Sequence, residues 1–173
     1  SNAYAPNIKR ALSFIKSKYH PSSKYPARSK DEAYFGGLIG GDREPMYEHA
    51  IAVLAFCEAL VSLEDTSLEP LIEEGIQLIA RTQNTEEKPQ ALGGPVKPDS
   101  PAYGGWRYKP DSLDADISVT GWHVLALKAA QNAGFKVPDL CLPKAAQFVR
   151  NCYYKSKGTF LYYPGGGEGC GRT

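Results

Sequence analysis

Two long segments of the chain contain few charges and have the spacing of helices. The segment 46–63 includes AIAVLAF at positions 50–56, and the segment 117–133 carries a formal charge only at Lys128. A helix that is apolar nearly all round its axis is normally surrounded by other protein. Both segments are therefore predicted to be inner helices.

Three other segments each show one apolar and one polar face. In the segment 68–79 the apolar residues recur at helical spacing, with Ser67 as the predicted N-cap and Pro70 in the first turn. The segments 7–19 and 138–154 show the same pattern. The chain thus alternates outer and inner helices, and the predicted fold class is all-α.

The helical segments also resemble one another. The outer segments align through ALSFI (11–15), GIQLI (75–79) and AAQFV (145–149). The inner segments align through HAIAVLAF and TGWHVLAL, which begin at positions 49 and 120. The loop GGWRYKP (104–110) matches KGTFLYYP (157–164), pairing Trp106 with Phe160 and Tyr108 with Tyr162. A helical hairpin of this kind cannot bury its faces alone, so neighbouring repeats must stack.

The repeats predict one domain over residues 4–173, as part of a longer array of helical hairpins. Residues 1–3 read Ser-Asn-Ala and are interpreted as a cloning scar. After the glycine-rich loop 164–173 the pattern calls for another inner helix. The apolar ends of such an array are expected to be covered by further repeats or by another copy in a homo-oligomer.

The region 104–127 combines a tight turn with an acidic helix start. The glycines of GGWRY allow left-handed backbone conformations, so Trp106 and Tyr108 are predicted to pack over neighbouring helix ends. Asp114 and Asp116 fall where the second inner helix begins, and the helix dipole favours carboxylates there. One of the two is expected to cap that helix.

Composition narrows the classes of partner. The formal net charge is +1, which gives no field to attract nucleic acid. The sequence contains no run of about 18 apolar residues, so no membrane span is predicted. The four cysteines (Cys57, Cys141, Cys152 and Cys170) show no C-x-x-C spacing, so no disulfide or metal framework is predicted, and neither a metal nor another cofactor is expected.

The Gly-Gly-Trp turn followed by DADISVTGWHVLALKAA resembles the repeats of the squalene–hopene cyclase and protein prenyltransferase β-subunit superfamily. The likeness covers roughly residues 34–164 and is greatest to uncharacterised prenyltransferase-like domains of bacterial multidomain proteins, which carry a similar D-x-S-V-T-G-W run. The resemblance implies an α/α toroid, in which inner helices ring a central cavity. Chemistry does not follow from fold alone.

In the cyclases of this superfamily a D-x-D-D motif begins an inner helix, and its middle aspartate protonates an alkene. The resemblance places Asp116 at that position and Asp114 at the first, while Ile117 replaces the last aspartate. A protonating acid needs a dry site that favours its neutral form. The alternative is that Asp114 or Asp116 only caps the helix.

Protein prenyltransferases hold zinc with D-x-C and a histidine from another inner helix. The pair Asp114 and Asp116 matches D-x-C only in part, because an aspartate stands in place of the cysteine. His49 would be the histidine, although it precedes the pair. A thiolate suits zinc better than a second carboxylate, so His49 and His123 are interpreted instead as hydrogen-bonded core histidines.

Inner-helix starts gather at one mouth of a toroid, so further polar residues are expected there. Asp42, Glu48 and His49 would share a rim with the acidic pair and form a ligand-binding or acid–base cluster. The alternative is a solvated loop with a salt bridge through Arg43. Trp122, inside the second inner helix, is the aromatic residue expected to line a cavity.

Two functions remain open. The first is a non-catalytic toroid segment that binds a ligand or partner, or serves as scaffold in a larger bacterial protein. The second is an isoprenoid-processing enzyme, of cyclase or prenyltransferase type, with Asp116 as acid or metal ligand. The expected ligand in either case is an isoprenoid or another apolar small molecule.

Overall fold

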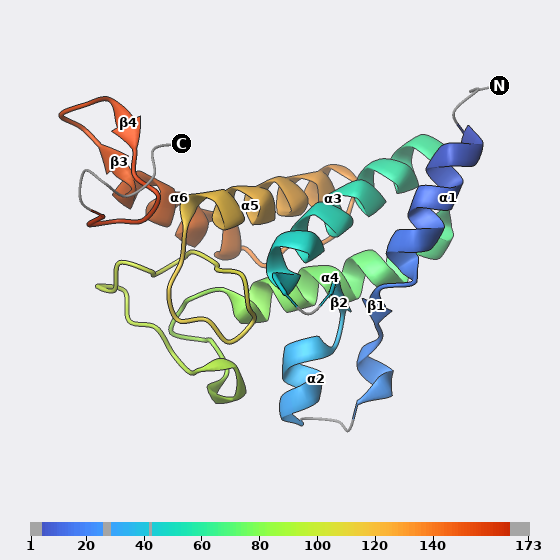
Figure 1. The fold of residues 1–173 in the computed structure, drawn as a ribbon, viewed down its shortest axis with the longest axis horizontal. Helices are drawn as coiled ribbons and strands as arrows, with labels where there is room; N and C mark the ends of the chain where they lie inside the picture. The colour runs from blue at the N-terminus through green and yellow to red at the C-terminus, as the bar shows by residue number, and fades with distance from the viewer. Residues whose placement is uncertain (1–4, 26–28, 42, 167–173) are drawn as a thin grey trace.

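The computed structural model describes residues 5–25, 29–41 and 43–166. This part of the chain is mainly helical, in agreement with the predicted all-α class (Figure 1). Its α-helices are α1 (Ala5–Lys16), α2 (Lys30–Phe35), α3 (Pro45–Leu63), α4 (Glu69–Thr82), α5 (Ile117–Asn132) and α6 (Cys141–Asn151).

Two small antiparallel strand pairs, which the sequence did not predict, shorten two of the expected helices. β1 (Tyr19–His20) pairs with β2 (Leu38–Ile39), so α1 ends at Lys16 rather than at Tyr19. β3 (Tyr153–Tyr154) pairs with β4 (Thr159–Phe160), so α6 ends at Asn151 rather than at Tyr154. In both places tyrosine backbone groups pair with a strand instead of continuing the helix.

The start of α4 also differs from the prediction. Ser67 was expected to cap it, but Ser67 lies within a 3-10 turn, Thr66–Leu68, that precedes the helix. Asp65 caps this turn by accepting a hydrogen bond from the Ser67 backbone N–H. The helix itself begins at Glu69 without a side-chain cap, and Pro70 stands in its first turn, where a proline loses no helical hydrogen bond.

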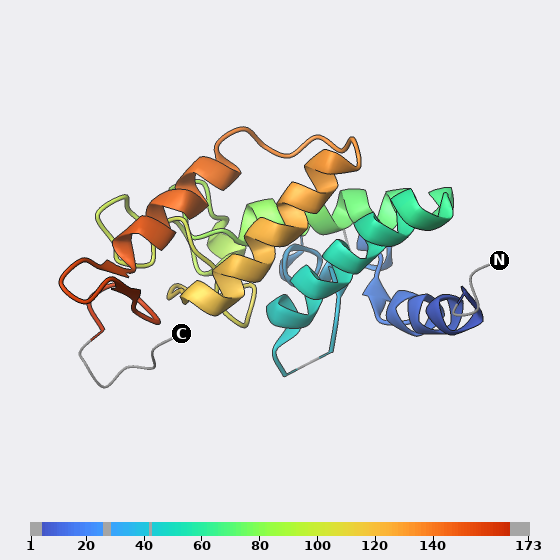
Figure 2. The same cartoon turned by 90° about the horizontal axis from the view of Figure 1, so that it is seen from above.

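The two central helices, α3 and α5, lie side by side and run in the same direction (Figure 2). Their contact is the most extensive between any two elements of the described chain. α4 and α6 run back behind them in a second layer, and α1 flanks α3 on the side away from α5. The core between these helices is apolar and includes Val53, Phe56, Ile72, Ile79 and Leu127.

Neither central helix is buried all round, contrary to the expectation from its composition. On α3 the side chains of Ile51 and Val61 are 37% and 65% exposed, and on α5 that of Leu125 is 51% exposed. Because apolar side chains stand where a surface helix would normally carry polar ones, an apolar stripe runs along the surface of both helices. Such a stripe is a candidate contact face.

The loops that lead into α3 and α5 press on the second layer in equivalent ways. Gly37 and Gly104 have φ angles of +85° and +86°, which favour glycine. A Cβ on Gly37 would lie 2.6 Å from the Glu74 carbonyl oxygen, and one on Gly104 would approach that of Lys144 still more closely. Glu74 and Lys144 directly precede the aligned segments at 75–79 and 145–149, so the two contacts are equivalent in the repeat.

The third residue of each of these loops, counted from the glycine, is tied to the central helix that follows. The Ile39 N–H donates to His49 Nδ1 at 3.0 Å, and the Trp106 N–H donates to Thr120 Oγ1 at 3.1 Å. His49 and Thr120 are the aligned first residues of the two inner-helix segments. The loop entering α3 is thus built like the one entering α5, although the sequences differ.

A third equivalence joins each central helix to a later turn. The Met46 N–H, in the first turn of α3, donates to the Tyr108 carbonyl at 3.0 Å. The Ile117 N–H, at the start of α5, donates to the Tyr162 carbonyl at 2.9 Å. Met46 and Ile117 occupy the same position ahead of the aligned inner segments, and the two tyrosines are the aligned aromatics of the glycine-aromatic loops.

One described helix, α3, is long and apolar enough to cross a membrane by length and composition alone. A helix in the core of a protein passes the same test, and α3 packs along α4 and α5. The observation is therefore weak, and no membrane span is established.

Candidate functional site

Asp116 stands at the start of α5 with no exposed surface. Its Oδ1 accepts from the Val119 N–H at 2.8 Å, which is the geometry of a helix N-cap. Its Oδ2 accepts from Arg107 Nη1 at 3.2 Å. Both carboxylate oxygens are therefore held by donors of the chain itself.

Arg107 connects the acidic pair to two tyrosines. Its Nε lies 3.4 Å from Asp114 Oδ2, and the Asp114 side chain is largely exposed. The guanidinium carbon lies 4.7 Å from the ring centre of Tyr108 and 5.4 Å from that of Tyr162. The hydroxyls of these tyrosines are hydrogen-bonded to each other. Arg107 had no predicted role, although its place between the aromatic residues Trp106 and Tyr108 was a usable sequence signal.

Opposing effects act on the Asp116 carboxyl. Burial is the strongest and raises its pKa above the ordinary value, because a dry site disfavours charge. The Val119 N–H, Arg107 and the Tyr162 hydroxyl favour the charged form and reduce that rise. Burial, together with the bond to Tyr108, also raises the pKa of Tyr162.

The loop before the acidic pair is positioned by buried polar groups that the sequence analysis did not identify. Asn84 Nδ2 donates to the Asp114 carbonyl at 2.8 Å. Lys88 Nζ donates to Asn84 Oδ1 at 2.9 Å and to the Ser112 carbonyl at 2.5 Å. Burial lowers the pKa of Lys88 to about 8. This network holds the backbone of the loop at Ser112 and Asp114 in place, and it keeps the Lys88 amine buried.

Trp106 packs where the sequence placed it, over the neighbouring helix. Its ring is stacked on His123 with centres 4.9 Å apart and planes 7° from parallel. Its Nε1 donates to the Ile79 carbonyl at 2.8 Å, which joins α4 to α5. His123 Nδ1 donates to the Val119 carbonyl at 2.8 Å, and burial lowers the pKa of this histidine to about 4.

His49 and Glu48, predicted for a ligand-binding rim, have separate structural partners. His49 is fully buried, accepts the Ile39 N–H at Nδ1 and donates from Nε2 to the Gly75 carbonyl at 3.1 Å. Burial lowers its pKa to about 3, so the ring is neutral. Glu48 is exposed and accepts the Gly41 N–H at 2.6 Å. Asp42 lies outside the described residues.

Trp122 is half-buried on α5 and points to α3. Its Nε1 donates to the Tyr47 hydroxyl at 3.0 Å, and the two rings meet edge to face with centres 6.2 Å apart. This contact bridges the central helices at the apolar stripe. Of the predicted site residues, Trp122 is the one that the structure places at an open apolar surface.

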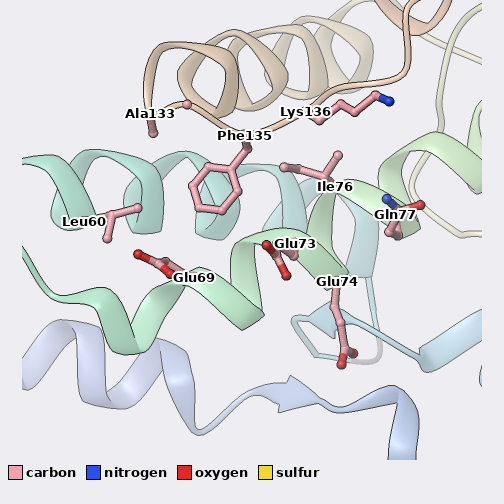
Figure 3. A pocket seen from close by; sticks show the side chains of 10 residues that line it. Leu60, Glu69, Glu73, Glu74, Ile76, Gln77, Ala133, Phe135 and Lys136 are labelled. Atoms are coloured by element: carbon pink, nitrogen blue, oxygen red, sulfur yellow. The ribbon is translucent and has the colours of Figure 1, made fainter.

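Asp116 lines none of the cavities described here. A space of about 190 Å³ beside Arg107 and Asp114 is smaller than the roughly 300–1,000 Å³ of typical ligand pockets. A groove of about 610 Å³ between α4 and the loop after α5 is lined by Glu69, Glu73 and Phe135, among others (Figure 3). A more apolar groove of about 520 Å³ lies between α1 and α3.

No cluster of three or more histidine, cysteine, aspartate or glutamate side chains able to hold a metal occurs in the described ranges. Cys57 and Cys141 are buried thiols, and Cys152 lies close enough to Asp116 for that carboxylate to act on its thiol. Burial first, and the charge of Asp116 second, raise the pKa of the Cys152 thiol to about 12, so this cysteine offers the acidic pair a thiol and not a thiolate. These residues do not fit a zinc site of the prenyltransferase kind. Cys170 lies outside the described residues.

Comparisons with known proteins add no relative: no family model, no curated protein and no solved structure matches this chain.

Proposed function

We propose that this chain is a non-catalytic helical-repeat domain of the α/α-toroid type, whose central helices α3 and α5 present a binding face for an apolar ligand or partner. The main support is the stripe along both helices, made of Tyr47, Ile51, Leu54, Val61, Trp122 and Leu125. In the alignment of the inner segments Ile51 pairs with Trp122, and Leu54 pairs with Leu125. The centre of the stripe therefore occupies the same two positions on both parallel helices, and Tyr47 and Val61 extend it on α3 alone.

The chemistry of the stripe suits an apolar molecule. The hydrogen bond between Trp122 and Tyr47 fixes two aromatic rings beside aliphatic side chains. Rings held in this way offer a large contact area at little entropic cost. In a toroid this side of the inner helices faces the central cavity, which is where the resemblance places an isoprenoid.

The surroundings of Asp116 favour binding over catalysis. Its carboxylate is buried, both oxygens have donors within the chain, and it lines none of the described cavities. An alkene would have to reach a proton there through Arg107 and the first turn of α5. The enzymatic alternative retains one supporting observation, which is the raised pKa of Asp116.

The test uses tryptophan fluorescence and thermal stability with farnesyl diphosphate and squalene as probes, each with and without zinc or magnesium. The chain has two tryptophans, and Trp106 is buried, so a change in emission reports on Trp122. Binding is expected to shift this emission and to raise the melting temperature by mass action. Leu125→Asp should abolish both effects, whereas Leu140→Asp, a matched change at another exposed leucine, should preserve them.

The absence of any shift with either probe would contradict the ligand-binding proposal. Turnover of an isoprenoid that disappears in Asp116→Asn, at unchanged stability, would instead establish the enzymatic alternative. Asp116→Asn is a suitable variant because an asparagine oxygen can still accept the Val119 N–H.

A further inference from the structure

The beginning of the chain is strongly basic, although the chain as a whole is nearly neutral. Residues 1–30 contain seven lysines and arginines and no aspartate or glutamate, which leaves 13 basic against 19 acidic residues in the rest of the chain. Four of the seven basic residues lie on α1 or within two residues of its end. α1 itself lies at one edge of the molecule, at the other side from α6 (Figures 1 and 2). The net charge of +1 therefore conceals a basic edge.

One face of α1 carries an exposed aromatic ring between two exposed cations. Arg10, Phe14 and Lys18 are spaced four residues apart, so they lie on the same face of a helix. Lys18 follows the end of α1, but its N–H still donates to the Ile15 carbonyl at 3.0 Å and continues the turn. Phe14 is 65% exposed, both basic residues are exposed, and Lys18 Nζ lies 5.3 Å from the centre of the Phe14 ring. These three residues are called the Phe14 face below.

The other outer helices bury the positions that α1 exposes. With the offsets of the aligned outer segments, the residues equivalent to Phe14 and Lys18 are all at most 3% exposed: Leu78 and Thr82 in α4, Phe148 in α6 and Cys152 directly after it. A lysine would not suit such a dry contact, because burying an unpaired ammonium is costly. The Phe14 face is therefore suited to polar, negatively charged surroundings rather than to the core of another repeat.

Two carboxylates near α1 are already engaged. Asp65 forms a salt bridge with Lys16 at 3.3 Å, and Glu48 accepts the Gly41 N–H. Within residues 5–25, 29–41 and 43–166, neither Arg10 nor Lys18 forms an ion pair. Arg10 donates to the side chain of Asn7, which is neutral. Both cations of the Phe14 face can therefore bind negative charge from outside the chain.

We propose that the Phe14 face docks on the surface of an anionic lipid bilayer, with Arg10 and Lys18 among the lipid phosphates and the Phe14 ring at the boundary with the acyl chains. The negative surface potential of the bilayer attracts each cation, and burial of the ring adds an apolar contribution. This contact is peripheral and needs no helix to cross the membrane. It also does not depend on any ligand of the stripe on α3 and α5.

The surface beside the Phe14 face favours lipid over nucleic acid. The groove of about 520 Å³ between α1 and α3 begins at Phe14 and Lys18 and is mainly apolar. Its far wall carries Ile51, which is 37% exposed, and Glu48, whose charge would repel a phosphate backbone. Proteins that bind single strands use a basic groove along the backbone instead. An apolar groove next to two cations suits acyl chains below a layer of phosphates.

The experiment measures co-sedimentation of the chain with vesicles of phosphatidylcholine alone and of equal parts phosphatidylcholine and phosphatidylglycerol. Binding is expected only to the anionic vesicles, and it should weaken as salt is added. Neutralising both cations in the double variant Arg10→Gln, Lys18→Gln should lower the partition coefficient roughly 25-fold, which corresponds to about fivefold for each cation. Phe14→Ser should lower it about tenfold by removing the buried ring.

Matched variants separate this face from the rest of the surface. The double variant Lys97→Gln, Lys136→Gln removes two exposed lysines elsewhere and should bind as the unmodified chain does. Leu125→Asp, which alters the stripe, should also leave vesicle binding unchanged, so the two proposals can fail separately. Phe14→Trp should add an emission that shifts to the blue on anionic vesicles. Circular dichroism checks the folding of each variant.

Three results would overturn the proposal. The first is an absence of binding to the anionic vesicles, or equal binding to both kinds. The second is binding that survives loss of Arg10 and Lys18. The third is a chain that binds a single-stranded oligonucleotide more tightly than the vesicles and loses no affinity in Phe14→Ser, which would assign the basic edge to nucleic acid instead.

Discussion

The loop entering α3 and the loop entering α5 make the same backbone contacts with different side chains. Each places a glycine of positive φ against a carbonyl of the second layer, and each ties its third residue to the central helix that follows. The tied residues are Ile39 in one loop and Trp106 in the other, and their acceptors are a histidine and a threonine. Backbone spacing is therefore retained where side-chain identity is not.

The two helix starts differ in how they satisfy their free N–H groups. α5 begins with the side-chain cap of Asp116, whereas α3 begins after Glu44 without a side-chain cap and has Pro45 in its first turn. Both starts nevertheless give one N–H to a tyrosine carbonyl of a later turn. The shared backbone contact provides the framework, and the side chains add local stability.

The glycine contact is expected to carry the largest effect. Gly104→Ala combines a φ of +86° with a Cβ that would overlap a carbonyl oxygen, so it should cost roughly 4 kcal/mol of unfolding free energy in urea titrations. Gly37→Ala should cost slightly less. Gly158→Ala is the control, because its positive φ comes with open space and should cost only about 1 kcal/mol. Equal losses at all three glycines would show that close approach plays no part.

The next largest loss of stability is expected at His49 and Thr120, whose side chains accept the N–H groups of Ile39 and Trp106. His49→Ala removes two buried hydrogen bonds and a ring, with an expected loss of about 3 kcal/mol. Thr120→Ala removes one hydrogen bond and a methyl group, with an expected loss of about 1.5 kcal/mol. Thr120→Ser keeps the hydroxyl and should restore most of that loss. If both alanine variants were as stable as the unmodified chain, the two ties would not hold the loops.

The two buried histidines should make the unfolding free energy fall at acid pH. Their pKa values fall from 6.5 to about 3 for His49 and about 4 for His123, so the folded state favours the neutral rings. Their contribution is complete above pH 6.5 and is lost as the pH falls. The unfolding free energy should drop by about 2.7 kcal/mol per pH unit between roughly pH 6 and 4, half of it from each histidine.

Urea titrations across this range measure the slope, and His49→Gln should halve it. The raised pKa of Asp116 acts in the opposite direction, since the folded state holds that proton more tightly. Asp116→Asn should therefore steepen the fall. A flat profile in the unmodified chain would contradict the neutral, buried state of both rings.

The helix starts should give the smallest effect. Asp116→Ala removes the cap of α5 and should cost about 1.5 kcal/mol, seen as a lower melting temperature. Asp116→Asn should cost less, because its amide oxygen still accepts the Val119 N–H. Glu44→Ala, at the uncapped start of α3, should change stability by no more than about 0.5 kcal/mol. A larger loss of stability in Glu44→Ala than in Asp116→Ala would show that the start of α3, and not that of α5, depends on its side-chain cap.

The sequence predicted the five main helices because their apolar residues recur with helical spacing. It missed α2 and the loop at Gly37, since that loop has Ile39 where the later loops have Trp106 and Phe160, and only the backbone conformation matches. The helix ends were misplaced where two-residue strands form, because those depend on partners far along the chain.

The candidate site was predicted in part. The acidic pair, the cap and the packing of Trp106 follow from local rules of helix starts and tight turns. The predicted polar rim was not found among the described residues. The sequence does not show which backbone groups a histidine on an apolar helix will bind, so the partners of His49 could not be predicted. In the structure His49 bonds to backbone groups of β2 and α4. Arg107 forms salt bridges with both Asp114 and Asp116.

The bonds from the helix starts to later tyrosine carbonyls also set an order of events during synthesis. The N–H of Met46 has no such acceptor until Tyr108 has been added to the chain, and that of Ile117 has none until Tyr162 has been added. A nascent chain released in the amino-to-carboxyl direction can therefore make the bond at the start of α3 only after the loop before α5 has emerged, and water binds that N–H until then. Each central helix thus receives its last tertiary backbone bond from the hairpin that is synthesised after it.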